Sequence, residues 1–544
     1  MIIQFSNVVG PIAHDVCIVG TGPIGLALAL SCAAKGRKVL MLESGSEQPS
    51  DFHTELGRGI IRDSASHATL QEANCRALGG TSHWWGGRCV PFDPIDFERR
   101  PAIPEADWPI GYGDVAAWYD QAAAFFRCGP ALFSIDGPWK DLTDLAFDQL
   151  ERWCPIPNMA YVHREALQQS SLITIVLDAT VTDIEFAEGA AGQRVVTALT
   201  AVNASRRMVI PTATLIVACG GVQTPRLLLS VQRQNPALFG GKDGPLGRFY
   251  MGHNFGKIAD VVIDEPKYGT DLDFFLDHGN YVRRRFTFPA DVQKREQLLN
   301  ISFAAGNARI SEPSHRNGIL SLIWLILASP IGKRLLPEAL LKIYVGEGRR
   351  RYGAHLVNIV RSPISTLVEC LKLYRDKYMR KPGKPAVFLW SAGGRYSLHY
   401  HSEQTPSPDC RLTLSDEVDA YKTPRLDIDF RYSEPDADRI VHAHEVLDRA
   451  LRANRIGRVE FNQDRSASVA GVLTQARDGM HQIGAARMSN DPSSGVVDRD
   501  CRVHGVENLF LASTCVFPSS GNANPTFLGV ALALRLAEHL TRSN

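Results

Sequence analysis

The sequence predicts a protein that joins a parallel α/β sheet to a second, antiparallel sheet of the α+β kind. A glycine-rich turn links an apolar strand to a helix at residues 16–35, and a second apolar strand at 215–219 runs into another glycine turn and a helix. Residues 256–310 and 386–435 alternate between apolar and polar side chains and have few helix caps, which is typical of antiparallel strands. A chain of 544 residues is too long for one hydrophobic core, so we expect two domains.

The first glycine turn predicts a Rossmann-like nucleotide-binding unit. Residues 16–19 are all apolar, as expected of a parallel strand that is covered on both faces. Gly20 permits the turn, Gly22 lets a pyrophosphate approach the backbone, and Gly25 lets the following helix pack closely on the strand. That helix, expected over residues 24–35, directs its free N–H groups at the phosphate. Glu43 ends the next strand, near the spacing of ~20 residues at which an acid holds a ribose hydroxyl. A glycine turn without a ligand is the alternative.

The composition argues against several classes of protein. Lys and Arg total 59 and Asp and Glu total 58, so the net charge does not indicate a nucleic-acid partner. The eleven cysteines are scattered singly and form no C-x-x-C pair, so neither a disulfide framework nor a metal site is predicted. A reducing, cytoplasmic setting fits this cysteine usage. The first fourteen residues lack the basic segment and the cleavage site of a signal peptide, and we expect none.

A second glycine-rich loop covers Gly79–Arg88. It contains two glycine pairs, and His83, Trp84 and Trp85 lie between them. Paired glycines indicate a crowded backbone or unusual dihedral angles. One interpretation is a tight turn with buried aromatic side chains, and the other is a second wall of the nucleotide site.

Residues 315–385 differ from the rest of the chain in charge and hydrophobicity. They contain fourteen basic and four acidic residues, and the run Ile319–Ala328 is densely apolar. Such a run, about ten residues long, is too short to span a bilayer, which needs ~20. Two interpretations stay open: a helical insertion that lies on an anionic membrane surface, and a buried helical hairpin with a solvated basic face.

The carboxyl-terminal part predicts the far side of the same site. A strand at 509–512, ending at Ala512, leads to a loop rich in Pro and Asn and then to a helix that Pro525 and Thr526 open. The amino end of that helix offers free N–H groups to an anion or a flavin ring. His481 lies before this strand in the sequence, and Asn524 lies at the end of the loop, directly before Pro525.

Together these segments resemble the glucose–methanol–choline (GMC) oxidoreductases, FAD-dependent enzymes that oxidise alcohols and sugars. The resemblance covers the first turn, the Gly79–Gly87 loop, the Gly220–Gly221 turn and residues 479–540. Residues 403–414 are similar to the carbohydrate-active, pyranose oxidase-like branch. The resemblance implies that FAD places its ADP part on the first turn and its isoalloxazine ring near the carboxyl-terminal residues.

The same resemblance implies roles for His481 and Asn524. His481 is then the base that faces the substrate hydroxyl, and Asn524 holds the substrate oxygen through its side-chain amide. Oxidation of an alcohol removes a hydride from carbon, which the flavin takes at N5 because no side chain can accept it. A neutral imidazole, with an ordinary pKa near ~6.5, is suited to take the proton from oxygen. On its own, a histidine such as His481 would be interpreted as structural.

The resemblance raises a separate question about His83. In the pyranose oxidases a histidine of this loop is covalently joined to the flavin, but here the distance from the glycine pair to His83 is one residue shorter. Other relatives carry Trp-His-Trp where this chain has His-Trp-Trp, and they have no such bond. A covalent link between His83 and FAD stays open.

The leading prediction is an FAD-dependent dehydrogenase or oxidase acting on an alcohol, with a sugar or glycoside hydroxyl as the expected substrate. Three alternatives are a hydroxynitrile lyase-type enzyme of the same fold, a non-catalytic flavin-binding protein and a nicotinamide dehydrogenase. The sequence does not identify the electron acceptor. Expected partners are the small-molecule substrate and a membrane surface contacted through residues 315–385, and nucleic acid is not expected.

We expect the FAD-binding domain to be discontinuous, with residues 1–255 as its first part and 471–544 as its carboxyl-terminal part. Residues 256–470 are expected to form the substrate-binding domain, which includes the basic helical insertion 315–385. The predicted cofactor-binding residues are Gly20, Gly22, Gly25, Glu43, Gly79, Gly80, Thr81, His83, Trp84, Gly86, Gly220, Ala512, Pro525 and Thr526.

Overall fold

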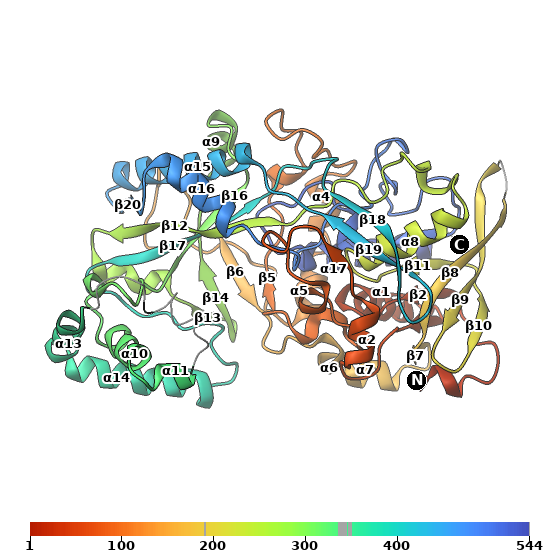
Figure 1. Ribbon diagram of the computed structural model, residues 1–544, viewed down its shortest axis with the longest axis horizontal. Coiled ribbons are helices and arrows are strands. Elements are labelled where there is room, and N and C mark those ends of the chain that lie inside the picture. Colours follow the sequence, from red (N-terminus) through yellow and green to blue (C-terminus); the bar gives the residue numbers. More distant parts are fainter. Residues whose placement is uncertain (190–191, 336–344, 346–350, 543–544) are drawn as a thin grey trace.

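The fold is built around a six-stranded parallel sheet. The computed structural model describes residues 1–189, 192–335, 345 and 351–542. The strand order in this sheet is β1-β7-β3-β2-β11-β21 (Figure 1). Every neighbouring pair is parallel, which confirms the predicted parallel sheet. Its strands are β1 (Ile2–Gln4), β2 (Val16–Val19), β3 (Val39–Leu42), β7 (Ile173–Leu177), β11 (Leu215–Val217) and β21 (Leu509–Leu511).

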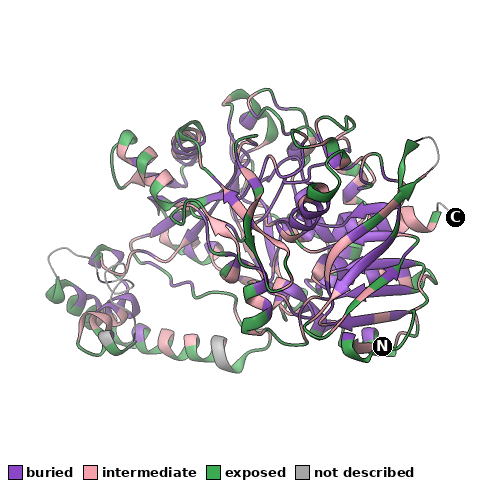
Figure 2. Ribbon diagram, turned by 45° about the vertical axis from the view of Figure 1, so that its right-hand side comes forward, coloured by how far each residue is buried: buried purple, intermediate pink, exposed green. Residues whose placement is uncertain are grey.

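Two helices pack against each other beside this sheet. Helix α1 (Pro23–Ala34) follows the first glycine turn, and α17 (Pro525–Arg542) packs on it. The helices approach closely at Gly529 of α17, where an added Cβ would lie 2.5 Å from the Ile24 side chain. The residues of α1 are almost all apolar because the sheet lies on one side of the helix and α17 on another. Figure 2 shows that the parallel sheet is buried along most of its length.

A second, antiparallel sheet has the order β15-β16-β17-β12-β20. Helices α15 (Glu434–Ala453) and α16 (Arg465–Gln475) pack with it around a separate cluster of buried apolar residues. Strands β12, β15, β16 and β17 come from the two segments in which the sequence predicted antiparallel strands or from their borders. The strands are β12 (His253–Ile263), β15 (Phe286–Thr287), β16 (Ile301–Gly306), β17 (Arg395–Glu403) and β20 (Gly457–Phe461).

Residues 386–435 also contain an antiparallel hairpin that lies outside this second sheet. Strands β18 (Arg411–Val418) and β19 (Pro424–Asp429) pair with each other and, through β19, with β4 (Ile60–Ile61). The hairpin packs on helix α8 (Gln223–Gln234), next to the parallel sheet, through a small apolar cluster of its own. A buried ion pair between Arg226 and Asp419, 2.8 Å apart, fixes it there. The predicted domain boundaries stay predictions.

The basic insertion forms a group of helices at one end of the molecule (Figure 1). The apolar run is helix α10 (Gly318–Ala328), in which Ile319, Leu320 and Trp324 are buried. Trp324 stacks on His355 of α13 (Tyr352–Arg361) at a ring-centre distance of 4.0 Å. Helix α10 is therefore the core of the insertion, as in the helical-hairpin interpretation. Helices α11 (Gly332–Leu335) and α14 (Pro363–Tyr374) complete the described part, followed by one π-helical turn at Arg375–Met379.

Of the helices that the structure describes, none combines the length and the apolar composition that crossing a membrane requires.

Residues 112–126 form two short helices, α4 (Tyr112–Ala116) and α5 (Tyr119–Phe126), and Trp118 between them packs against the main core. Helix α8 begins at Gln223, two residues before Pro225. The remaining elements include β5 (Arg88–Cys89), β6 (Leu150–Trp153), β8 (Thr180–Glu188), β9 (Arg194–Val202), β10 (Arg207–Pro211), β13 (Phe275–Asp277), β14 (Asn280–Arg284), α2 (Asp51–Leu56), α3 (Leu70–Ala73), α6 (Met159–Val162), α7 (Arg164–Gln169) and α9 (Ala290–Arg295).

Candidate active site

The first glycine turn lies between the carboxyl end of β2 and the amino end of α1. Gly20 has φ +104°, and an added Cβ would lie 2.5 Å from the carbonyl oxygen of Ala218, the residue that directly follows the neighbouring strand β11. An added Cβ at Gly25 would lie 2.4 Å from the Gly20 carbonyl oxygen, so Gly25 lets α1 approach the turn. At Gly22 the added Cβ would meet no atom within 4 Å. The protein itself therefore does not require glycine at 22, whereas a ligand lying against this backbone would.

Glu43 links the end of β3 to the glycine turn. Its buried carboxylate accepts hydrogen bonds from the Thr21 N–H at 3.0 Å, from the Thr21 hydroxyl at 2.6 Å and from the Gly45 N–H at 2.9 Å. These bonds hold the turn in place beside β3. Each carboxylate oxygen has more than one acceptor position, so Glu43 can still accept a bond from a ribose hydroxyl.

The second glycine loop packs directly onto the first turn. Gly79 and Gly80 both have positive φ, and a Cβ added to Gly80 would lie 2.8 Å from the Gly22 Cα. Residues Gly80–His83 form one turn of 3-10 helix. This loop is therefore a wall over the first turn, which is the functional interpretation that the sequence left open.

One cavity of about 740 Å³ runs from the first glycine turn to the carboxyl-terminal segment. A cavity of this size lies within the range of cofactor and ligand sites in proteins. It is lined by most of the predicted residues, namely Gly20, Gly22, Glu43, Gly80, Thr81, Trp84, Gly86, Gly220, His481, Ala512, Asn524, Pro525 and Thr526.

Gly25, Gly79 and His83 are not among the described residues that line this cavity. Gly25 and Gly79 instead allow close packing around the two turns, since an added Cβ would lie 2.4 Å from the Gly20 carbonyl oxygen and 2.9 Å from the Ala160 side chain, respectively. His83 lies in the loop with one ring nitrogen 2.9 Å from the Leu78 carbonyl oxygen and within 3.4 Å of the Asn158 amide nitrogen. The histidine thus interacts with its own loop and its neighbour.

The cavity wall contains a partly buried cation that sequence reasoning did not select. The Arg76 guanidinium donates hydrogen bonds to the Ser44 hydroxyl at 2.8 Å and to the Gln223 side-chain oxygen at 2.7 Å. Its Nε is buried without a hydrogen-bond partner among the described residues, and burial lowers the pKa of Arg76. A partly buried cation whose bonded partners are neutral groups suits an anionic ligand. Together with the glycine turn, Arg76 makes this end of the cavity fit the pyrophosphate and ribose of a dinucleotide such as FAD.

At the other end of the cavity the structure brings His481 and Asn524 together. The Asn524 side-chain nitrogen lies 2.8 Å from the His481 Nε2. The Asn524 Oδ1 is buried and has no hydrogen-bond partner among the described residues. Asn524 directly precedes α17, and His481 is fixed by its neighbour Gln482, whose backbone packs on Gly221 so closely that a Cβ there would lie 2.1 Å from the Gln482 carbonyl oxygen.

A buried carboxylate, Asp478, orients the imidazole. The His481 Nδ1 lies 3.2 Å from Asp478 Oδ2, and the same carboxylate accepts the N–H groups of His253 at 2.8 Å, Met480 at 2.9 Å and His481 at 3.1 Å. Burial opposes its ionisation, but the nearby His481 and His253 and the hydrogen bonds hold the pKa of Asp478 at about 2. The ionised Asp478 favours a proton on His481 Nδ1, which leaves Nε2 as the acceptor that faces Asn524 and the cavity.

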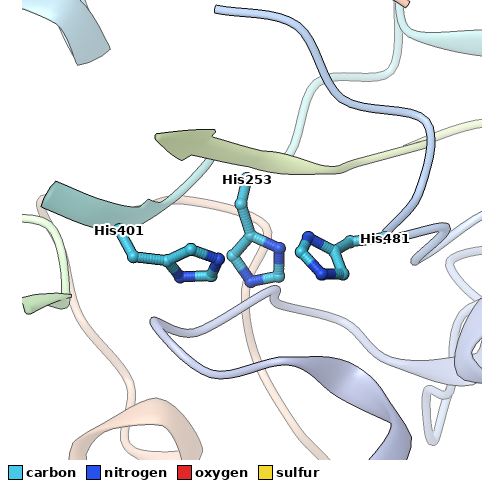
Figure 3. Close-up of side chains that lie close together, drawn as sticks. All are labelled: His253, His401 and His481. Carbon is cyan, nitrogen blue, oxygen red and sulfur yellow. The ribbon is translucent and has the colours of Figure 1, made fainter. Parts of the chain in front are cut away.

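Two further histidines pack beside His481 (Figure 3). His253 of β12 lies between His401 of β17 and His481, with ring-centre distances of 4.4 Å and 4.7 Å. Burial, and then the neighbouring His481, lowers the pKa of His253 to about 3, and burial and His253 lower the pKa of His401 well below its ordinary value. Both rings are therefore neutral at ordinary pH and add no charge beside His481.

The same three histidines are the group among the described residues whose geometry could hold a metal ion, with their ligand atoms within 4.8 Å of one another. His481 already uses both ring nitrogens, one towards Asp478 and one towards Asn524. The arrangement fits proton transfer better than metal binding, and the absence of a metal stays a prediction.

Sequence reasoning missed Asp478, His253, His401 and Arg76 as parts of the site. The spacing of Asp478 and His481, three residues apart in a loop, follows no pattern that marks a carboxylate–imidazole pair. His253 and His401 lie far apart in the chain and meet only because β12 and β17 pair. Arg76 lies just before the second glycine loop, and its position beside that loop was the available signal.

The chain is similar to several known oxidoreductases. Residues 406–533 match a family model described as GMC oxidoreductase. The chain is 23% identical to 2-methyl-1,2-propanediol dehydrogenase of Mycolicibacterium austroafricanum, over 97% of this chain and 95% of that protein. It is 30% identical to paromamine 6'-oxidase of Streptomyces fradiae over 24% of this chain and 23% of that protein. It is 31% identical to C-glycoside 3-oxidase of Microbacterium trichothecenolyticum over 24% of each chain.

The solved structure of pyridoxine 4-oxidase from Mesorbium loti shares the fold. Its TM-score is 0.52 at 16% sequence identity, and the match covers 97% of this chain and 99% of that chain. Residues 406–533 thus resemble the GMC oxidoreductases, while the whole chain is similar to one dehydrogenase and shares the fold of pyridoxine 4-oxidase.

Proposed function

We propose that the protein is an FAD-dependent enzyme that oxidises an alcohol, most specifically a sugar or glycoside hydroxyl, to the carbonyl. The observation that carries the proposal is the single cavity that joins the first glycine turn to the His481–Asn524 pair. A dinucleotide held at one end of this cavity and a base at the other are the two parts that alcohol oxidation needs.

In this proposal the residues of the cavity wall hold FAD without a covalent bond. The Gly20–Gly22 turn and the amino end of α1 hold the pyrophosphate, with Arg76 beside it, and Glu43 holds the ribose. Ala512, Pro525 and Thr526 lie at the other end, where the amino end of α17 offers free N–H groups. Bound FAD supplies the hydride acceptor at flavin N5.

His83 does not support a covalent link in this proposal, because its ring interacts with the Leu78 carbonyl oxygen and the Asn158 side chain. Acid precipitation tests this point. We expect the flavin colour to stay wholly in the supernatant, and colour retained in the washed pellet would mean that FAD is covalently bound.

Three residues have separate roles in the proposed reaction, namely His481, Asn524 and Asp478. The substrate oxygen takes the place between His481 Nε2 and the Asn524 amide, which lie 2.8 Å apart when they bond directly. Asn524 then donates its N–H to that oxygen, while His481 Nε2 accepts the hydroxyl proton. Asp478 stabilises the imidazolium that forms, since its carboxylate contacts the opposite ring nitrogen. The buried His253 and the partly buried His401 pack their rings against this side of the base.

The proposed substrate class rests on relatives and on one segment of the chain. The similar proteins include oxidases of paromamine and of C-glycosides, and the dehydrogenase of a small diol. Gln404, in the segment that resembles the carbohydrate-active branch, accepts the Gly252 N–H at 2.9 Å, and its backbone N–H bonds the Ser520 hydroxyl at 2.9 Å. The segment thus supports the loops around the site and does not itself reach the described cavity wall.

Anaerobic reduction of the purified protein tests the proposed function. Sugars, glycosides, amino sugars and simple alcohols are added one at a time while the visible flavin absorption is followed. We expect bleaching with at least one carbohydrate class and release of the matching carbonyl product. Cleavage of a cyanohydrin with no bleaching by any alcohol would instead support the hydroxynitrile lyase-type alternative.

We also propose a cytoplasmic location with peripheral contact at a membrane. All eleven cysteines are free thiols in the structure, which suits a reducing compartment. The basic composition of residues 315–385 supports the membrane contact.

A further inference from the structure

Helix α14 exposes its apolar side to solvent. Ile364, Leu367, Val368, Leu371 and Tyr374 follow one another at helical spacing, so they share one face at 3.6 residues per turn. Their exposed fractions lie between 42% and 78%. We call these five residues the α14 face. An amphipathic helix of a globular protein normally turns such a stripe towards the core.

The orientation of α14 is fixed by its opposite side, which packs on α10. Thr366 is buried, and Cys370 and Leu373 pack on the cluster that contains Ile319 and Leu320. The helices approach closely at Gly318, where an added Cβ would lie within 1.9 Å of the Thr366 hydroxyl oxygen. The outward direction of the aliphatic residues of the α14 face is therefore a consequence of this packing.

Basic side chains border the α14 face. Lys372 is exposed on α14 itself, and Arg361, Arg375, Arg380 and Lys381 are exposed near its two ends. Asp376 pairs with Arg375 at 3.1 Å and with Arg380 at 3.4 Å, so the acid is neutralised within the same turn. The whole segment 315–385 holds fourteen basic and four acidic residues. The surface around the α14 face is thus cationic.

We infer that the α14 face docks on an anionic membrane surface. Aliphatic side chains on one face of a helix enter the boundary between headgroups and acyl chains, while flanking Lys and Arg contact anionic headgroups. Tyr374 suits the same boundary because its ring is apolar and its hydroxyl is polar. The helix group also forms one end of the molecule, away from the parallel sheet, so a flat surface can reach it (Figure 1). This assigns the contact to α14 and not to the apolar run of α10, which is the core of the insertion.

Vesicle flotation of the purified full-length holoprotein tests the inference. Vesicles of phosphatidylcholine alone are compared with vesicles that contain phosphatidylcholine and phosphatidylglycerol. We expect the protein to float with the anionic vesicles, to stay unbound with the neutral ones, and to dissociate as salt is raised. Failure to float with anionic vesicles at low salt would overturn the inference.

The matched variants are L367D/L371D on the α14 face and V209D/L276D elsewhere on the surface. All four positions are at least half exposed, and both double variants add the same charge. We expect L367D/L371D to reduce the bound fraction at least tenfold and V209D/L276D to bind as the unmodified protein does. Thermal melting and flavin content should be unchanged in both, since no buried contact is lost.

Two results would contradict the inference in this comparison. One is equal vesicle binding by L367D/L371D and the unmodified protein. The other is a self-associated protein in sedimentation that becomes monomeric in L367D/L371D, which would make the α14 face an interface between copies of this chain. The inference deepens the proposed membrane contact, and because neither readout depends on turnover, it fails or stands separately from the proposed catalytic function.

Discussion

Replacing Asp478 by Asn should slow flavin reduction by the substrate without emptying the cofactor site. The Asp478 carboxylate lies 3.2 Å from His481 Nδ1 and contacts no part of the cavity end at which the first glycine turn lies. An amide at this position can place its N–H2 group against the imidazole, which favours the tautomer whose Nε2 carries the proton. That tautomer cannot accept the hydroxyl proton.

The expected size of the effect follows from the bond that is lost. A hydrogen bond to a charged group is worth about 1.5–3 kcal/mol net, and a tenfold rate change corresponds to about 1.4 kcal/mol, so the reduction rate should fall about 10- to 150-fold. The assay is anaerobic stopped-flow reduction with the substrate found in the screen, at several pH values.

A double-mutant cycle separates positioning from simple damage to the fold. If Asp478 acts through His481, the Asp478→Asn change should have little further effect in a His481→Ala background. Asp436→Asn, at a buried carboxylate that bonds Thr405 instead, is the matched control and should leave the reduction rate unchanged. Additive losses in the cycle, or an equal loss in the control, would refute the positioning role of Asp478.

Three other predictions concern the cofactor end of the cavity and the core. Gly22→Ala should fold normally but bind FAD more weakly, whereas Gly25→Ala should lower the unfolding free energy by about 2 kcal/mol because its Cβ meets the Gly20 carbonyl oxygen; flavin titration and thermal melting distinguish them, and tight FAD binding by Gly22→Ala would count against the predicted pyrophosphate position. Arg76→Gln should weaken FAD binding about 10- to 100-fold, since a charge-assisted bond to the pyrophosphate is lost, and an unchanged dissociation constant in reconstitution of the apoprotein would show that Arg76 is not a ligand. Burial lowers the pKa of His444 to about 4, so the unfolded chain takes up this proton below its ordinary value of 6.5 and the folded protein only near 4. As the pH is lowered from 6.5 to 4, the unfolding free energy should therefore decrease by about 3 kcal/mol because of this group. In the His444→Leu variant this decrease should be smaller, and an equal pH dependence of the unfolding free energy in the variant would contradict the prediction.

The parallel sheet and its glycine turn could be predicted because their signals are local. Four apolar residues before Gly20, the glycine spacing and the acid at 43 all act within one strand–helix–strand unit. The prediction that His481 and Asn524 act together came from the family resemblance. The structure places the two side chains at the end of the same cavity. Their chemical roles stay proposals.

The remaining parts of the site depend on tertiary structure, and the sequence does not report it. His253 and His401 reach His481 only through the pairing of β12 with β17. The hairpin of β18 and β19 has the alternation of an ordinary antiparallel sheet, but its apolar side and the Arg226–Asp419 pair attach it to α8. His83 was expected at the cofactor wall, and the turn of its loop directs it to the Leu78 carbonyl oxygen.

Helix α14 illustrates the same limit. Its apolar spacing is visible in the sequence, but the sequence does not say which side is buried. The small residues Gly318 and Thr366 let the other side of α14 pack on α10, and the apolar side is left outside. Exposure of that stripe is therefore a property of the folded insertion.

The most direct test of the account is anaerobic reduction of the His481→Ala protein loaded with FAD. We predict a normal flavin spectrum, normal reduction by dithionite, and a nearly complete loss of reduction by the alcohol that bleaches the unmodified protein. Reduction of this variant by the alcohol at the unmodified rate would contradict the claim that His481 takes the substrate proton.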